Sequence, residues 1–223
     1  MGLNKSKGNM YPFVTHTWNA IKGKCLNDCI YCYMKNPKYK LKAPRLDRKE
    51  LRTDLEEGNF IFVGSSTDMF ARDLPYDWII DTLKYCNRFD NQYLFQTKNP
   101  EIMGKYLNVI PPDSILACTV ETDYMLDLSN KIYTYYSPTR GGIFATLKWP
   151  RKMVSIEPVV DFNTDSFIQL IEAINPEFVS IGADSQGHNL LEPTAEKIGA
   201  LIKGLETFTK VIQKKNLRRL YGR

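Results

Sequence analysis

The feature that most constrains this chain is a group of three cysteines near its start, in the segment KCLNDCIYCY at residues 24–33. Cys25, Cys29 and Cys32 are separated by three and then two residues. Thiolates with this spacing can each bind a different iron of one 4Fe-4S cluster. The segment 25–33 therefore supplies ligands for three corners of a cluster, and it predicts that the fourth iron is open to a ligand from outside the protein.

The three cysteines also allow two other interpretations, a zinc site or thiols with no shared ligand. Structural zinc sites are tetrahedral and take a fourth Cys or His close by. No such residue follows in the sequence, and His16, the nearest candidate, would have to reach across from a different segment. The spacing favours the cluster, and zinc stays open as the alternative.

The cysteine spacing resembles the cluster motif of the radical S-adenosylmethionine (SAM) superfamily, and Tyr31 and Tyr33 fit the same pattern. In that superfamily the amino and carboxylate groups of SAM bind the open iron. The resemblance implies reductive cleavage of SAM to a 5′-deoxyadenosyl radical, which takes a hydrogen atom from the substrate. It also implies a partner that donates the electron, such as flavodoxin or ferredoxin.

The composition is typical of a globular protein. With 43% hydrophobic and 25% charged residues among 223, we expect one domain, 1–223, with a sizeable core. No apolar run is long enough to span a membrane, and residues 1–10 lack the apolar core of a signal sequence. An odd number of cysteines, three of them clustered, argues for a reducing compartment. We expect a cytoplasmic protein in which Cys86 and Cys118 are buried packing residues.

Strand-like and helix-like patterns alternate along the chain. The predicted strands are 13–19, 60–64, 93–96, 114–118, 153–156 and 178–181. The predicted helices are 45–57, 76–89, 100–107, 142–149, 165–174 and 194–214. Such alternation predicts parallel βαβ topology. We therefore expect an α/β fold, a partial and laterally open (β/α)6 barrel of parallel strands that is similar to a TIM barrel.

One connection is longer than the others. Residues 122–142 form most of the link between two predicted strands, and they contain Tyr124, Tyr133, Tyr135, Tyr136 and Arg140. A long loop in a compact fold is typically functional. We interpret it as a candidate lid over the substrate, and an insertion without a function is the alternative.

The predicted strands from the second to the sixth each end in polar residues. In a barrel of parallel strands, the carboxyl ends and the loops after them build the active site. The side chains at these ends are Ser65, Ser66, Asp68, Lys98, Thr119, Glu121, Glu157 and Asp184. Five polar strand ends at one edge of a barrel predict a binding site there.

These side chains can form hydrogen bonds and ion pairs with the polar groups of SAM, the cofactor that the resemblance implies. Ser65, Ser66 and Asp68 can bind its ammonium group, and Lys98 its carboxylate. Thr119 or Glu121 can bind the ribose.

The remaining polar candidates have less specific roles. Glu157 is either a SAM or substrate ligand or a structural acid. Asp184, His188 and His16 are substrate-side candidates for which a structural role is an alternative.

Within the superfamily, the chain resembles two groups more closely. It resembles a small phage-associated family over most of its length. It resembles spore photoproduct lyase only over the half that would hold the cluster and SAM. The matching motifs are Thr17-Trp18-Asn19, Tyr31-Cys32-Tyr33, SSTD at 65–68, Thr97-Lys98 and SIEP at 155–158. The lyases hold SAM with a Ser-Asp pair and a Lys at the equivalent strand ends, whereas here Thr67 separates the two. No equivalent of the lyase's DNA-wedging hairpin is found. No clear equivalent of its radical-relaying cysteine is found either, with Cys118 as the remaining alternative, so repair of a DNA photolesion is not the favoured function.

The formal net charge is only +5, but the basic residues gather in two places. One group follows the cysteines at residues 35–49, and the other is a basic C-terminal tail, 210–223. Tyrosines lie among them, which suits contact with phosphates and bases, although a solvated surface is the alternative.

Together with the phage resemblance, the basic groups suggest a nucleic-acid substrate, a DNA or nucleotide base derived from thymidine. The alternatives are an activase that abstracts hydrogen from a glycine of a partner enzyme and a radical SAM enzyme acting on a small molecule. A nucleic-acid-binding protein with a structural metal site is a further alternative, from another class.

Overall fold

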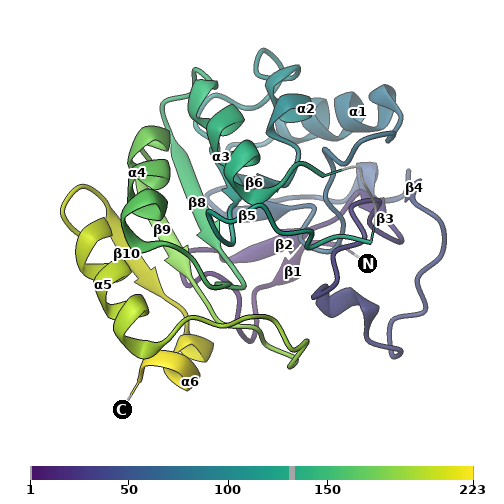
Figure 1. Ribbon diagram of the computed structural model, residues 1–223. Helices are drawn as coiled ribbons and strands as arrows, with labels where there is room; N and C mark the ends of the chain where they lie inside the picture. Colours follow the sequence, from purple (N-terminus) through teal and green to yellow (C-terminus); the bar gives the residue numbers. More distant parts are fainter. Residues whose placement is uncertain (1, 131–133, 223) are drawn as a thin grey trace.

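A computed structural model of the chain describes residues 2–130 and 134–222. Within them, the main sheet runs in the order β1-β2-β5-β6-β7-β8-β9-β10 (Figure 1). The strands are β1 Asn4–Lys5, β2 His16–Trp18, β5 Phe60–Val63, β6 Gln92–Thr97, β7 Ile115–Thr119, β8 Lys152–Ile156, β9 Phe178–Ile181 and β10 Lys210–Gln213. Only β1 pairs antiparallel with its neighbour in this sheet.

A helix lies between each pair of successive parallel strands from β5 to β10. These helices are α1 Tyr76–Cys86, α2 Pro100–Gly104, α3 Ser137–Thr146, α4 Thr164–Ile174 and α5 Ala195–Leu205. Asn163 and Thr194 cap α4 and α5 by accepting hydrogen bonds from Ser166 N and Lys197 N. The predicted α/β partial barrel with a parallel sheet is therefore confirmed. No helix in the described part of the chain is long and apolar enough to cross a membrane.

The predicted helix at 45–57 is wrong. Arg45–Leu46 forms strand β4, which pairs with β3 (Ile21–Lys22), and only Glu50–Arg52 makes a 3-10 turn. The acidic residues that suggested a helical face are used elsewhere, because Asp47 and Glu50 both bind Lys22 Nζ, at 2.8 and 2.6 Å. These ion pairs tie β3 to the residues after β4, and the two paired strands lie on either side of the cysteine segment in the sequence.

The predicted helix at 194–214 is also wrong in its second half. Helix α5 ends at Leu205, and residues 210–213 form β10, which pairs in parallel with β9. The β-branched Val211 and Ile212 suit a strand better than a helix. The start of the predicted basic tail is thus a sheet edge, followed by a 3-10 turn at Lys215–Leu217 and the short helix α6, Arg218–Tyr221.

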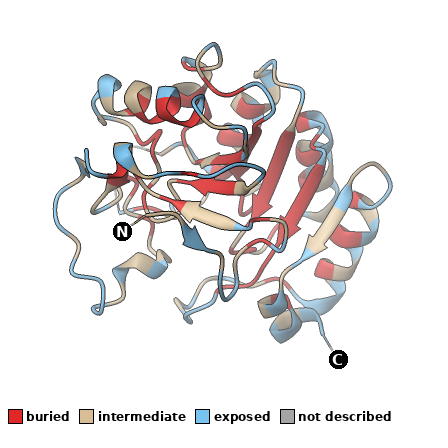
Figure 2. Ribbon diagram, turned by 180° about the vertical axis from the view of Figure 1, so that it is seen from behind, coloured by how far each residue is buried: buried red, intermediate tan, exposed pale blue. Residues whose placement is uncertain are grey.

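Alternation along the strands separates two apolar layers. Residues such as Val63, Phe95 and Cys118 face the helices, and Phe62, Leu94 and Ala117 face the inside of the barrel. Tyr11 and Phe13, from the segment before β2, pack into the inner layer. Figure 2 shows that the central strands are the buried part of the sheet. The inner face therefore has an apolar base, on which the polar strand ends rest.

Cys86 and Cys118 are both fully buried in the layer between sheet and helices. Their predicted role as packing residues is confirmed. Because its side chain lies on the helix side of β7, Cys118 does not face the inside of the barrel.

Gly23 generates a prediction about the entry to the cysteine segment. Its φ is +112°, and a Cβ there would lie 2.4 Å from the Ala43 carbonyl oxygen. Gly23→Ala should therefore lower the free energy of unfolding by roughly 2 kcal/mol or more, measured by urea denaturation. Gly142→Ala is the control, because nothing lies within 4 Å of its Cβ and it stands in a helix, where alanine stabilises by up to about 1 kcal/mol. Equal stability of Gly23→Ala and the wild type would contradict this reading of the turn.

Candidate cofactor site

An open cleft lies at the carboxyl ends of the strands, with an empty volume of about 980 Å³ that includes the part open to solvent. Its lining contains all the residues predicted for cluster and cofactor except Glu121. These residues are Cys25, Cys29, Cys32, Tyr31, Tyr33, Ser65, Ser66, Asp68, Lys98, Thr119 and Glu157. Side chains from separate strand ends and from the cysteine segment thus meet in one place, as the polar strand ends predicted.

The three cysteines form part of one wall of the cleft. Cys29 is buried, and Cys25 and Cys32 are partly buried. Burial first, then the nearby Asp68 and Cys29, raises the pKa of Cys25 to about 12, and burial also raises the pKa of Cys29. Bound metal would act against this rise in the pKa of Cys25 and Cys29, because metal binding favours the thiolate form. Soft sulfur donors are the ligands that iron-sulfur clusters use, so the residues fit such a group.

The zinc alternative makes a different geometric demand. A single zinc ion requires three or four donors that converge on one point. In residues 2–130 and 134–222, no three His, Cys, Asp or Glu side chains are placed to hold one metal ion.

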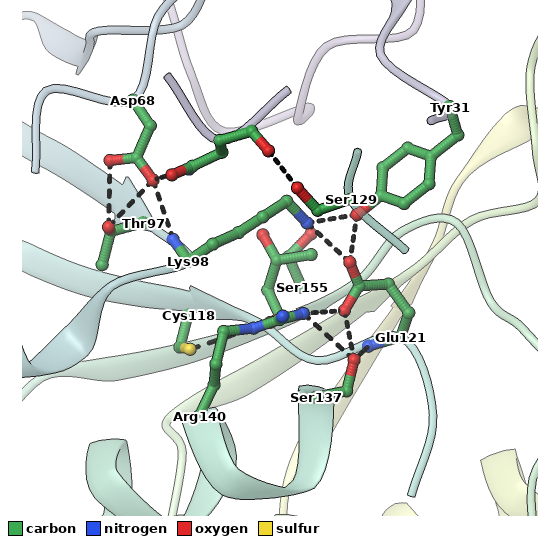
Figure 3. Close-up of polar contacts among 12 residues, drawn as sticks. Tyr31, Asp68, Thr97, Lys98, Cys118, Glu121, Ser129, Ser137, Arg140 and Ser155 are labelled. Atoms are coloured by element: carbon green, nitrogen blue, oxygen red, sulfur yellow. Dashed lines mark hydrogen bonds and ion pairs between the residues drawn. The ribbon is translucent and has the colours of Figure 1, made fainter. Parts of the chain in front are cut away.

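Asp68 joins the cysteine segment to two strand ends. Its Oδ2 accepts a hydrogen bond from the Lys98 backbone N–H at 2.9 Å (Figure 3). The same oxygen accepts from Asn27 Nδ2 at 2.7 Å. Its Oδ1 accepts from Thr97 Oγ1 and the Phe70 backbone N–H, both at 2.9 Å. Asp68 therefore acts as a structural link, and its predicted contact with an ammonium group would be an addition to these bonds. Asn27, which lies between the first two cysteines and is 1% exposed, was not predicted as a site residue.

Ser65 and Ser66 are held by Asn19. Asn19 Oδ1 accepts from the Ser66 backbone N–H and hydroxyl, both at 3.0 Å, and Asn19 Nδ2 donates to Ser65 Oγ at 3.3 Å. The backbone carbonyl of Ser65 in turn accepts from Tyr33 Oη at 2.9 Å. These contacts give a structural reason for the Thr17-Trp18-Asn19 motif, in which the sequence assigned Asn19 no role.

Glu121 is the centre of a buried network behind the cleft (Figure 3). Its Oε1 accepts from Lys98 Nζ at 2.6 Å and from Tyr31 Oη, which also contacts Lys98 Nζ. Its Oε2 accepts from Ser137 Oγ at 2.6 Å and pairs with Arg140. Burial alone would raise the pKa of Glu121, but Arg140 and Lys98 outweigh it and lower this pKa to about 2.

The network changes the interpretation of two predicted features. Of the two residues predicted for the ribose, Thr119 lines the cleft, whereas both oxygens of Glu121 are bound by protein donors. Arg140, expected in the lid, is 3% exposed and lies in α3, which begins at Ser137 and not at residue 142. Residues 131–133 of the lid, including Tyr133, lie outside the described residues. A lid role for the rest of 122–136 stays a prediction.

Glu157 is held by a second ion pair at the cleft. Its Oε1 accepts from Ser180 Oγ at 2.8 Å, and its Oε2 lies 3.0 Å from Lys214 Nζ. Burial raises the pKa of Glu157, and Lys214 offsets only part of that rise. Lys214 also lies over the ring of Tyr11, 4.5 Å from its centroid. Sequence reasoning missed this role of Lys214, because the residue was assigned to a helix.

Tyr11 connects the N-terminal segment to polar residues on the inner face. Its hydroxyl donates to Gln96 Oε1 at 2.8 Å and lies 2.9 Å from Ser155 Oγ. Gln96 Nε2 then donates to Thr119 Oγ1 at 2.9 Å. The chain of bonds fixes the hydroxyl of Thr119 at the cleft. Neither Tyr11 nor Gln96 was predicted as a site residue, although Gln96 at an apolar strand's end was a usable signal.

The two histidines are placed differently. His16 lies in β2, with Nδ1 3.0 Å from Thr15 Oγ1, and does not line the cleft. His188 and Asp184 do line it, in the loop after β9. A substrate-side role thus has geometric support for His188 and Asp184 and none for His16.

Comparison with known proteins gives a fold relationship only. No protein-family model matches the chain, and no curated protein matches it in sequence. Among solved structures, a cysteine-to-serine variant of spore photoproduct lyase matches with a TM-score of 0.63 and 9% identity over 92% of this chain and 78% of that one. Another, with bound AdoMet and dinucleoside spore photoproduct, matches with a TM-score of 0.53 and 9% identity over 90% of this chain and 64% of that one.

The predicted resemblance to spore photoproduct lyase is therefore confirmed for the fold alone. The resemblance to a phage-associated family stays a prediction.

Arg140 generates a stability prediction for the site. Arg140→Met would leave Glu121 with Lys98 as its only cation, so it should lower the free energy of unfolding by roughly 3–5 kcal/mol in urea. The control is Arg151→Met, because Arg151 pairs with Glu177 where both are partly exposed and should lose about 1 kcal/mol or less. Similar losses in the two variants would show that the buried pair is not the stabilising contact inferred here.

Proposed function

We propose that this chain is a radical SAM enzyme that acts on a nucleic-acid base. Cys25, Cys29 and Cys32 would hold a 4Fe-4S cluster whose fourth iron takes the amino and carboxylate groups of SAM. When bound, the cluster and SAM supply an electron and a 5′-deoxyadenosyl radical that abstracts hydrogen from substrate. The observation that carries this proposal is that the three thiols line the same cleft as the polar ends of five strands, on a fold similar to that of spore photoproduct lyase.

Different side chains of the cleft would bind different groups of SAM. Lys98 Nζ would bind the carboxylate, the hydroxyls of Ser65 and Ser66 the ammonium, and Thr119 Oγ1 a ribose hydroxyl. Lys98 already contacts Glu121, but an ammonium has three donors and can serve a second carboxylate. Arg140 continues to neutralise Glu121 when Lys98 turns towards the cleft.

The position of Cys118 bears on the type of reaction. Its thiol is 0% exposed on the helix side of β7, and Cys86 is buried in α1, so neither can reach a substrate in the cleft. In the described residues, the cysteines that line the cleft are the three proposed ligands. A thiol relay of the lyase type is therefore not supported. A rearrangement or modification, in which the substrate radical needs no thiol donor, is favoured over repair.

A base as substrate is supported by aromatic and basic groups next to the cysteines. Tyr33 and Tyr39 are 43% and 37% exposed, their ring centroids are 6.2 Å apart, and Lys38 Nζ lies 4.8 Å from the Tyr39 ring centroid. Exposed aromatic rings with nearby cations bind single-stranded nucleic acid by stacking and by charge. With the phage resemblance, we propose modification or rearrangement of a thymidine-derived base, reached in single strands or by extrusion from a duplex.

The cluster and its chemistry give the first test of the function. After anaerobic reconstitution with iron and sulfide, the wild type should hold a 4Fe-4S cluster and release 5′-deoxyadenosine from SAM with dithionite. Cys29→Ala should lose both iron and 5′-deoxyadenosine, whereas Cys118→Ala, which alters a cysteine outside the cleft, should keep its iron. Lys98→Met should also keep its iron but bind SAM roughly tenfold more weakly or worse.

Two results would count against this function. A wild type that binds iron but forms no 5′-deoxyadenosine would favour a binding protein with a structural metal site. Unchanged SAM affinity in Lys98→Met would remove the carboxylate role of Lys98.

The substrate class has a test of its own. Single-stranded DNA carrying thymidine deuterated in the base methyl group should transfer deuterium to 5′-deoxyadenosine, detected by mass spectrometry. DNA deuterated only in its cytosine bases is the control and should transfer none. If 5′-deoxyadenosine forms without deuterium from either DNA, the substrate is not a thymine methyl group, and a glycine of a partner enzyme or a small molecule becomes the better candidate.

A further inference from the structure

Asp184 and His188 form a hydrogen-bonded pair on the wall of the cleft, in the loop after β9. His188 Nδ1 lies 2.7 Å from Asp184 Oδ1, and the His188 backbone N–H donates to Asp184 Oδ2. The Gln186 backbone N–H donates to Oδ1 at 3.1 Å. The side chain of Asp184 is 4% exposed and that of His188 is 21% exposed. The pair therefore has a buried acid behind an imidazole that reaches the cleft.

The hydrogen bonds fix which nitrogen of His188 carries the proton. Burial would raise the pKa of Asp184, but the bonds from the backbone and ring of His188 and from Gln186 outweigh it and lower this pKa. An ionised carboxylate can only accept, so Nδ1 must be the donor of the bond to Asp184. In the neutral imidazole the other nitrogen, Nε2, then carries a lone pair and is an acceptor.

The C-terminal segment supports this loop. Arg219 donates to the Asp184 backbone carbonyl at 3.0 Å and also pairs with Glu192. Asn216 Nδ2 donates to the Ala183 carbonyl at 2.6 Å and to Ser185 Oγ at 3.0 Å. These contacts hold the Asp184 backbone in place. Asn216 and Arg219, from the predicted basic tail, thus position the Asp184–His188 pair through hydrogen bonds to its loop.

Nε2 of His188 is the polar atom of this pair left for a ligand. None of the hydrogen bonds formed between described residues uses it, and His188 lines the same cleft as the three cysteines and Lys98. We propose that Nε2 of His188 accepts a hydrogen bond from the imide N3–H of a thymine-type base bound in the cleft. This inference rests on the proposed function and specifies how that site selects its base.

The chemistry of the bases gives the acceptor its selectivity. A thymine or uracil ring presents N3–H as a donor between two carbonyl groups, whereas N3 of cytosine is itself an acceptor. Nε2 of His188, kept as an acceptor by Asp184, would accept a hydrogen bond from N3–H of thymine or uracil. It would face N3 of cytosine, a second acceptor, without forming a hydrogen bond. Sites built to hydrogen-bond a substrate group reject analogues that lack it, because the site's own polar atom is then left unpaired.

The first experiment tests the tautomer without any activity. The full chain contains only two histidines, so isotope-labelled histidine gives two sets of ring-nitrogen resonances, and His16→Gln assigns them. At a pH where the ring is neutral, His188 should show a protonated, pyrrole-like Nδ1 and a bare, pyridine-like Nε2. The reverse tautomer would overturn the proposal. Asp184→Asn should reduce the preference for the Nδ1–H form.

The second experiment tests recognition in the reconstituted protein with SAM. Equilibrium dialysis should give a Kd for thymidine roughly tenfold lower than for 3-methylthymidine, which lacks N3–H, and than for deoxycytidine. His188→Phe keeps a flat ring without nitrogen and should bind thymidine and 3-methylthymidine equally. His16→Phe, altered away from the cleft, should keep the difference.

The outcomes separate this inference from the proposed function. Equal Kd values for thymidine and 3-methylthymidine in the wild type, or a tenfold ratio that persists in His188→Phe, would overturn the role of His188, even with 5′-deoxyadenosine formation intact. Absence of the cluster or of 5′-deoxyadenosine would instead count against the proposed function. If His188→Phe does not fold, the tautomer measured in the wild type and the wild-type Kd ratio still decide the question.

Discussion

The structure of the site depends on a buried carboxylate, Glu121, held between two cations. Glu121 is 0% exposed, and Lys98 and Arg140 each bind one of its oxygens. A buried charge without partners would be strongly unfavourable, whereas a paired and hydrogen-bonded one is tolerated. Through Tyr31, the same carboxylate reaches the segment between the second and third cysteines. The network therefore connects the ends of β6 and β7, helix α3 and the cysteine segment (Figure 3).

Asp68 makes a second connection of the same kind. It binds Asn27, between the first two cysteines, and the Lys98 backbone at the end of β6. The cysteine segment is thus anchored on both sides of Cys29 by carboxylates that come from the sheet. With these anchors, three thiols can occupy a defined wall of the cleft through protein contacts alone. We infer that the polar strand ends have two functions, since some hold the segment and others face the cleft.

The sequence predicted the parts of this structure that depend on local patterns. Alternating apolar runs identified the parallel sheet, and polar strand ends identified the cleft. The sequence did not show which polar residues face the cleft, because that depends on tertiary partners. Glu121 binds Arg140, a residue 19 positions later in a segment expected to be a lid. Lys214 follows directly on residues 210–213, which form a strand although the sequence pattern predicted a helix through Lys214, and it pairs with Glu157.

Asn19 and Asn27 show a further limit of sequence reasoning. Both lie in the sequence motifs around the cysteines and Trp18, but an asparagine between cysteines or after a tryptophan can form many different local hydrogen bonds. Only the fold shows that their amides bind Ser65, Ser66 and Asp68. The sequence thus predicted where the cleft lies, and the structure shows which residues support its wall.

The central claim is that three cysteine ligands leave one iron of a cluster for SAM, and the most direct measurement is Mössbauer spectroscopy of protein reconstituted with isotopically enriched iron. On addition of SAM, one iron in four should change its spectrum while the other three keep sulfur coordination. Four irons that do not respond to SAM would contradict the claim, because SAM would then not bind an iron of the cluster. A colourless protein that takes up zinc in place of iron would contradict it as well.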